Sequence, residues 1–229
     1  MNDAKRKVLD MVEQGRISPA EGGALLTAME GRKGPGFGLL LDPHERLGTV
    51  PALAIGAAVA VASAGVAVSM GVRFDGFMDI HTGGGQVLPL AAAIDQLVAW
   101  PVSALLLWLC ALPFTRQARY IDFLAALGVA RVIQLVAGLA LAPLSPGEDE
   151  LLRMAQNPVA ALHGIAGMLP MIIVALALVS WFVAALVFAF RHASGLRRGR
   201  LAGAFVLALF VTEAASKAIL FAVGQCHMG

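Results

Sequence analysis

The chain has 229 residues, of which 59% are hydrophobic and only 14% are charged, and its formal net charge is +2. Soluble domains are about 45–50% apolar and about 25% charged, so this composition excludes an ordinary soluble protein and predicts an integral membrane protein with the lipid bilayer as its solvent. The small net charge argues against a nucleic-acid partner. The two cysteines lack the spacing of a zinc or redox site, so we expect no metal and no cofactor.

A polar N-terminal segment precedes the first apolar run, and it predicts a helical hairpin over residues 1–31 followed by a linker over residues 32–48. Ser18 begins the second helix of the hairpin as a capping box, with proline at the next position and glutamate three residues after the cap. The apolar side chains fall into two groups at helical spacing: Val8, Met11 and Val12, and then Leu25, Leu26 and Met29. We expect these two faces to pack together, since neither helix is long enough to persist alone.

Five apolar runs follow, each close to the roughly 20 residues that cross a bilayer. They are residues 49–70, 87–112, 120–141, 169–190 and 201–223, and a short tail over residues 224–229 ends the chain. Residues 148–156 have helical composition and predict a short helix on the membrane surface. The start of the fourth span stays open, because the apolar sequence extends back to Asn157 and Pro170 permits a kink. The predicted fold class is an all-α membrane protein: a five-helix transmembrane bundle plus a short N-terminal cytosolic helical hairpin.

Lysine and arginine residues alternate between the two sides of the predicted bundle. The segments before the first span, between the second and third, and between the fourth and fifth hold thirteen of them, whereas the alternate segments hold only Arg73 and Arg153. Cytosolic loops carry the excess of lysine and arginine in membrane proteins. The alternation therefore predicts a cytosolic N-terminus and an outer C-terminus.

Ionisable side chains inside the predicted spans mark candidate functional residues, because a charge within a bilayer is costly. Counting about 1.5 Å per residue from the span ends, Asp95, Arg131 and Glu213 all lie about 10–15 Å below the outer surface. Neighbours on the same helix faces complete a polar cluster across the second, third and fifth spans: Gln134, Ser216 and Lys217. Three interpretations stay open. The residues pair within the bundle and fix its register, they line a conduit for protons, ions or lipid headgroups, or they face different directions.

Catalytic motifs are not evident in the sequence. The five histidines lie in separate segments, and no nucleophile can be paired with a base, so we do not expect an enzyme. The second half of the chain does not resemble the first, and the inverted repeats of many secondary carriers are therefore not evident either.

Two apolar stretches carry a family resemblance, ARYIDFLAALGVARVIQLVAGLALAPL and WFVAALVFAFRHASGLRRGRLAGAFVLALFVTEAASKAILFAV. With them, residues 49–223 resemble the bacterial members of the Yip1 family, which implies five spans and a place in the bacterial cytoplasmic (inner) membrane. The eukaryotic relatives carry an aspartate-leucine-tyrosine-glycine-proline motif before the first span. This chain lacks that motif, so the resemblance does not imply their binding of Rab GTPases.

The N-terminal stretch VLDMVEQGRISPAE gives residues 5–29 a resemblance to the helical hairpin called a SHOCT-like domain. That resemblance implies contact with a protein, by docking or by oligomerisation. Our leading hypothesis is therefore a non-enzymatic inner-membrane protein that organises or assists other membrane components through the hairpin. Its partners would be the lipid bilayer and either another protein or a second copy of the chain. The alternative is a transporter or permease subunit that uses the polar cluster for ions, protons or lipid headgroups.

Overall fold

The computed structural model describes residues 3–30, 47–82, 85–146 and 148–228. The chain divides into two compact units, Met1–Leu40 and Leu41–Gly229. Helices make up 80% of the chain, and no strand occurs among the described residues, which confirms the predicted all-α class.

The first unit is a hairpin of α1 (Asp3–Glu13) and α2 (Pro19–Glu30). Its capping box is formed: the Ser18 amide donates to Glu21 Oε2 at 2.8 Å, and the Glu21 amide donates to Ser18 Oγ at 3.3 Å. Hydrogen bonds from the Ser18 backbone and hydroxyl hold the pKa of the Glu21 carboxyl below its ordinary value. Gly15 makes the turn between the helices with a positive φ of 65°.

The two helices of the hairpin close on most of the predicted apolar side chains. Those that are buried or half-buried are Val8, Met11, Val12 and Leu26. Gly22 brings the helices close, because a Cβ atom there would stand 2.3 Å from Cγ2 of Val12. Gly22 and Leu26 are one turn apart and fill the contact face, so Leu25, predicted on that face, is 43% exposed, and Leu9 is 46% exposed. The side chain of Met29 lies outside the described part.

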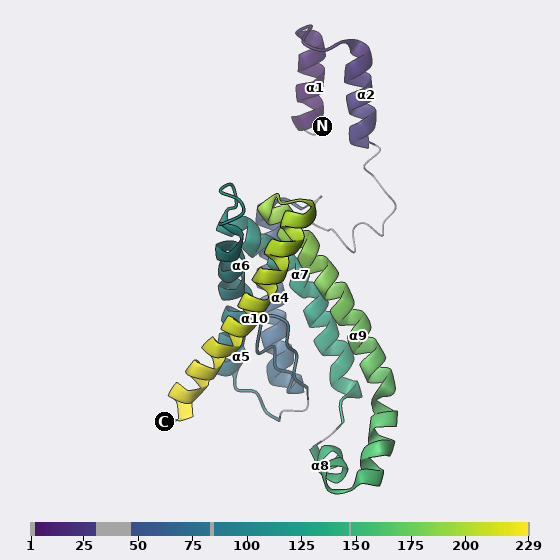
Figure 1. Ribbon diagram of the computed structural model, residues 1–229, viewed down its shortest axis with the longest axis vertical. Helices are drawn as coiled ribbons and strands as arrows, with labels where there is room; N and C mark the ends of the chain where they lie inside the picture. Colours follow the sequence, from purple (N-terminus) through teal and green to yellow (C-terminus); the bar gives the residue numbers. More distant parts are fainter. Residues whose placement is uncertain (1–2, 31–46, 83–84, 147, 229) are drawn as a thin grey trace. The chain divides into compact units, whose positions relative to one another are not determined.

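In the described part of the second unit, five helices are long and apolar enough to cross a membrane (Figure 1). They are α4 (Thr49–Met70), a second span made of α5 (Pro89–Leu97), the π-turn η2 (Val98–Val102) and α6 (Ser103–Ala111), then α7 (Tyr120–Leu141), α9 (Pro158–Ser194) and α10 (Arg198–Met228). A 3-10 turn, η3 (Ala142–Leu144), and the short helix α8 (Glu148–Gln156) connect α7 to α9.

The observed helices differ from the predictions in the second, fourth and fifth spans. In the fifth, α10 extends through residues 224–228, which were predicted as a tail. Pro101 interrupts the second span, because a proline nitrogen cannot donate to the helix ladder, and the chain widens into η2 there. Ser103 Oγ donates to the Val98 carbonyl at 2.8 Å. In the fourth span, Pro170 lies within a continuous α9 that begins at Pro158, well before the predicted start at residue 169.

Helix α7 lies at the centre of the second unit. Of its most apolar stretch 61% is buried, compared with 17% for α9 and for α10. On one side α4 approaches it through two glycines, since a Cβ atom at Gly128 would stand 2.8 Å from the Cα of Gly56. Trp100 of η2 covers this contact and donates its indole N–H to the Leu124 carbonyl at 2.8 Å.

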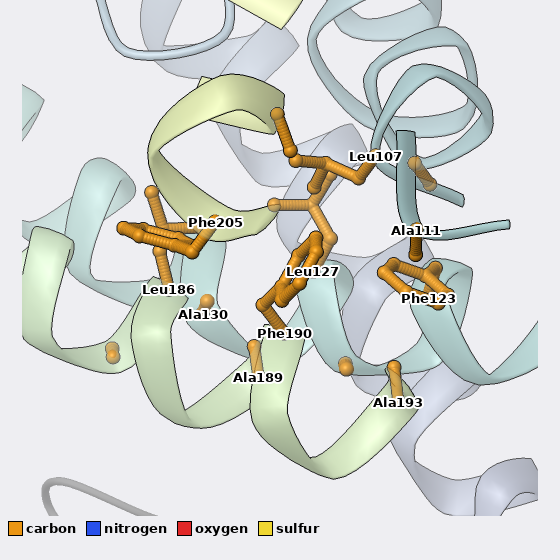
Figure 2. Close-up of a cluster of buried hydrophobic side chains, with 14 of the residues drawn as sticks. Leu107, Ala111, Phe123, Leu127, Ala130, Leu186, Ala189, Phe190, Ala193 and Phe205 are labelled. Carbon is orange, nitrogen blue, oxygen red and sulfur yellow. The ribbon is translucent and has the colours of Figure 1, made fainter. Parts of the chain in front are cut away.

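On the other side of α7, an apolar core joins it to α6, α9 and α10 (Figure 2). Phe190 of α9 stands at its centre and makes edge-to-face contacts with Phe123 at 5.5 Å and Phe205 at 5.7 Å between ring centroids. The cavity among these side chains measures only about 10 Å³ and has an apolar lining. At most one water molecule would fit there, so the core is not a ligand site.

The capping box should make the hairpin sensitive to acid. Because the folded pKa of Glu21 is lowered from 4.5, its contribution to stability is complete above pH 4.5 and is lost as the pH falls through the folded value. We expect the ¹³Cα shifts of residues 18–24 to move toward random-coil values below pH 4.5 in the parent protein. In Glu21→Gln, which can still accept a hydrogen bond but does not titrate, the shifts should stay constant; an equal acid response would contradict this role.

The glycine contact between α4 and α7 should tolerate no side chain. Gly128→Ala forces the two backbones apart and should destabilise the protein by about 1–3 kcal/mol in unfolding from mixed micelles. Gly65→Ala is the matched control, because a Cβ atom there meets nothing within 4 Å, and it should be neutral or slightly stabilising. Equal effects of the two substitutions would disprove the close approach.

Candidate functional site

The segment between α4 and α5, described over residues 71–82 and 85–88, is called the α4–α5 connection below. Gly71 ends α4 in the left-handed conformation, and the backbones of Arg73 and His81 then exchange two hydrogen bonds of 2.8 Å. These bonds close residues 73–81 into a loop. Phe74 and Phe77 of this loop are fully buried, so the connection folds into the bundle at the end where α4 and α7 finish.

Side chains of α7 and α10 satisfy the buried backbone of the connection. Gln134 Nε2 donates to the Phe77 carbonyl at 3.1 Å, and the Phe77 amide donates to Ser216 Oγ at 3.2 Å. The next amide, of Met78, donates to Glu213 Oε2 at 3.2 Å. Irregular backbone is tolerated at membrane depth only where protein or water supplies its hydrogen bonds, and three of the predicted cluster residues supply them here.

Lys217 adds an ionic contact to the same loop. Its ammonium group pairs with Asp79 of the connection and, at 3.3 Å, with Glu213 one turn earlier on α10. Glu213 therefore binds both a backbone amide and a cation. All three predicted residues of α10, namely Glu213, Ser216 and Lys217, face the α4–α5 connection.

Asp95 is held by a residue that was not assigned to the cluster from the sequence. Arg73 of the connection donates to it through Nε at 3.2 Å and through Nη2 at 3.1 Å, which is the bidentate geometry of a strong ion pair. Asp95 is 2% exposed, whereas Arg73 is 42% exposed. This hydrogen bond raises the pKa of Arg73 above its ordinary value.

Arg131 lies at the middle of α7 and is only 1% exposed. Its Nη2 donates to Gln96 Oε1 at 2.7 Å, and its Nε donates to Gln134 Oε1 at 3.1 Å. Both acceptors are neutral amides. The remaining nitrogen, Nη1, has no hydrogen-bond partner among the described residues, and the same is true of Gln96 Nε2.

The structure thus brings the six predicted residues around one loop, although they do not form one continuous set of direct contacts. Gln96 links the second span to the third through Arg131, and Phe77 links the third to the fifth. Sequence reasoning missed Arg73, Phe77, Asp79 and Gln96. Two phenylalanines among charges in RFDGFMD could have indicated a buried loop, since large aromatic side chains are seldom left exposed. Gln96 directly follows Asp95 and lies about 100° away around the helix, so it does not share the helix face on which the cluster was predicted.

The arrangement is suited to holding a loop. Its carboxylates lie next to cations or backbone amides, in ion pairs and hydrogen bonds that fix the loop. Among the residues that the structure describes, no group of three histidine, cysteine, aspartate or glutamate side chains is placed to hold a metal ion.

Comparison with known proteins identifies the hairpin. The family model described as a SHOCT-like domain matches residues 5–34, in agreement with the resemblance of the first helices. Neither the curated proteins nor the solved structures gave a match to the chain. The Yip1 family was not found, so the comparisons support a SHOCT-like hairpin joined to five apolar helices.

If the connection holds the bundle together, removing the buried aromatic ring of Phe77 should lower the stability of the protein. Phe77→Ala leaves a cavity between α7 and α10 and should destabilise the protein by about 3–5 kcal/mol in unfolding from mixed micelles. Phe221→Ala, at a 70% exposed position of α10, is the matched control and should change stability by less than about 1 kcal/mol. A small effect of Phe77→Ala would mean that the connection is not part of the folded core.

Proposed function

We propose that this protein is a non-enzymatic membrane protein that organises or assists other membrane components, with the SHOCT-like hairpin as its docking or oligomerisation element. One observation carries the proposal: the folded hairpin leaves Leu9 and Leu25 exposed, one large apolar side chain from each helix. Exposed leucines on a small domain attached to membrane helices are suited to bind another protein.

The contacts in the membrane unit agree with a scaffold. The cluster carboxylates Asp95 and Glu213 are both engaged, the first with Arg73 and the second with Lys217 and a backbone amide. Groups used to hold a loop in place support a fixed bundle that carries the hairpin. The family and location belong to the same proposal: a Yip1-like membrane domain in the bacterial inner membrane.

The charge pattern supports a cytosolic hairpin. Thirteen lysine and arginine residues lie on the side of the N-terminus, compared with two in the alternate segments. By the positive-inside rule the hairpin would meet cytosolic proteins or the hairpins of neighbouring copies.

The exposed leucines provide the test. Leu9→Asp with Leu25→Asp should lower recovery of the partner at least tenfold, because burying one leucine contributes about 1.5–3 kcal/mol and 1.4 kcal/mol is a factor of ten. Crosslinking between two differently tagged copies measures self-association, and co-purification from membranes measures another partner. Leu26 is left intact, since it is half-buried and its replacement would unfold the hairpin.

Ala24→Asp is the matched control, because Ala24 is also exposed on α2 but is not a large apolar side chain. It should leave both kinds of association unchanged. If the leucine variant, inserted normally, keeps both its copies and its partners, the docking proposal is wrong.

A second candidate, a transporter or permease subunit, is favoured by one observation. Buried Arg131 has neutral acceptors, and one of its nitrogens has no partner in the part of the chain that the structure describes. Flux of small ions in proteoliposomes distinguishes this candidate from the scaffold. A parent protein without measurable flux would count against it.

A further inference from the structure

Four buried polar atoms have no hydrogen-bond partner among the described residues, and each belongs to a different helix. They are Ser63 Oγ on α4, Gln96 Nε2 on α5, Arg131 Nη1 on α7 and Thr212 Oγ1 on α10. None of the four residues is more than 6% exposed. Buried polar groups are nearly always satisfied in proteins, so four together need a physical explanation.

The heights of Ser63 and Arg131 along the bundle follow from the glycine contact between α4 and α7. Gly56 and Gly128 pack against each other, and from that point α4 and α7 both run toward the α4–α5 connection. At about 1.5 Å per residue, Ser63 lies about 10 Å beyond Gly56, and Arg131 lies about 5 Å beyond Gly128. The two side chains are therefore within about one helical turn of the same level.

The other two helices reach that level as well. Gln96 of α5 is bonded directly to Arg131. On α10, Ser216 is level with Gln134, because both bind the peptide groups of Phe77. Thr212 precedes Ser216 by one turn, just as Arg131 precedes Gln134 by about one turn. By these estimates the four unpartnered atoms lie at about the same level of the bundle, beneath the connection, and this level is called the layer below.

This layer contains one full positive charge and more hydrogen-bond donors than acceptors. Arg131 is cationic, and its acceptors, Gln96 and Gln134, are neutral. The two unpartnered nitrogens are donors, and the two hydroxyl groups can donate. A buried cation without a counter-charge is unfavourable by several kcal/mol, and charge-assisted hydrogen bonds to an anion offset that cost. The neighbouring carboxylate of Asp95 is already neutralised by Arg73.

We propose that Arg131, with Gln96, Ser63 and Thr212, forms a buried binding site for a small monovalent inorganic anion. Because all four residues are buried, the ion that suits this site is one that sheds its water, such as a halide. The site is independent of the docking role proposed for the hairpin.

Chloride is the probe for the experiment. Purified full-length protein in nanodiscs is titrated with ³⁶Cl⁻ at constant ionic strength, with gluconate as the replacing anion, and its thermal midpoint is followed in parallel. The parent protein should bind chloride saturably, and its midpoint should rise with chloride concentration, since a ligand that binds only the folded state stabilises it. Arg119→Gln removes an exposed cation before α7 and should change neither result.

Gln96→Glu is the decisive variant. Its carboxylate would stand beside Arg131 Nη2 and supply the missing negative charge within the protein. We expect it to fold and to bind chloride at least tenfold more weakly, with a thermal midpoint that no longer depends on chloride. Thr212→Val, which removes one hydroxyl at equal size, gives an independent test and should weaken binding about five- to tenfold.

Two results would overturn the proposal. If the parent binds no chloride saturably, water alone satisfies the four atoms. If Gln96→Glu and Thr212→Val bind chloride as the parent does, the anion site lies elsewhere.

Discussion

The peptide groups of Phe77 are the constraint on which the membrane unit depends. A bilayer offers no water to an irregular backbone, so the α4–α5 connection can enter the bundle only if side chains receive it. Gln134 of α7 takes the carbonyl and Ser216 of α10 takes the amide, so the two helices are linked through one residue. This link is needed because α9 and α10 diverge from the short turn that joins them (Figure 1). The second half of α10 is therefore held through the connection.

Much of the helix content could be predicted from the sequence, because it depends on local patterns. The ends of α4 and α7 coincide with the ends of their apolar runs, and the capping box marks the start of α2. The loop could not be predicted in the same way. Phe77 and Ser216 are 139 residues apart, and hydropathy carries no information about such a pairing. The exposure of Leu25 was also beyond reach, since neighbouring helical residues differ by about 100° and only the partner helix decides which one is covered.

The two units make different use of polar and apolar side chains. In the membrane unit, polar groups lie inside and apolar groups such as Phe210 lie outside, where lipid is the solvent. In the hairpin the apolar faces lie inside, and the exceptions are the exposed Leu9 and Leu25. The same residue type thus has different surroundings in the two units: an exposed leucine on α10 faces lipid, whereas an exposed leucine on α2 lies on the hairpin's polar surface.

The length of α9 has a mechanical consequence. Its 37 residues rise about 55 Å, whereas the 22 residues of α4 and of α7 rise about 33 Å, close to the roughly 30 Å of the hydrocarbon core. A change in membrane thickness leaves α9 still embedded, because the helix has apolar length in reserve and can alter its tilt. Helices α4 and α7 have no such reserve, and both finish at the α4–α5 connection. A change in membrane thickness would therefore strain α4 and α7 and, through them, the loop that packs at their ends.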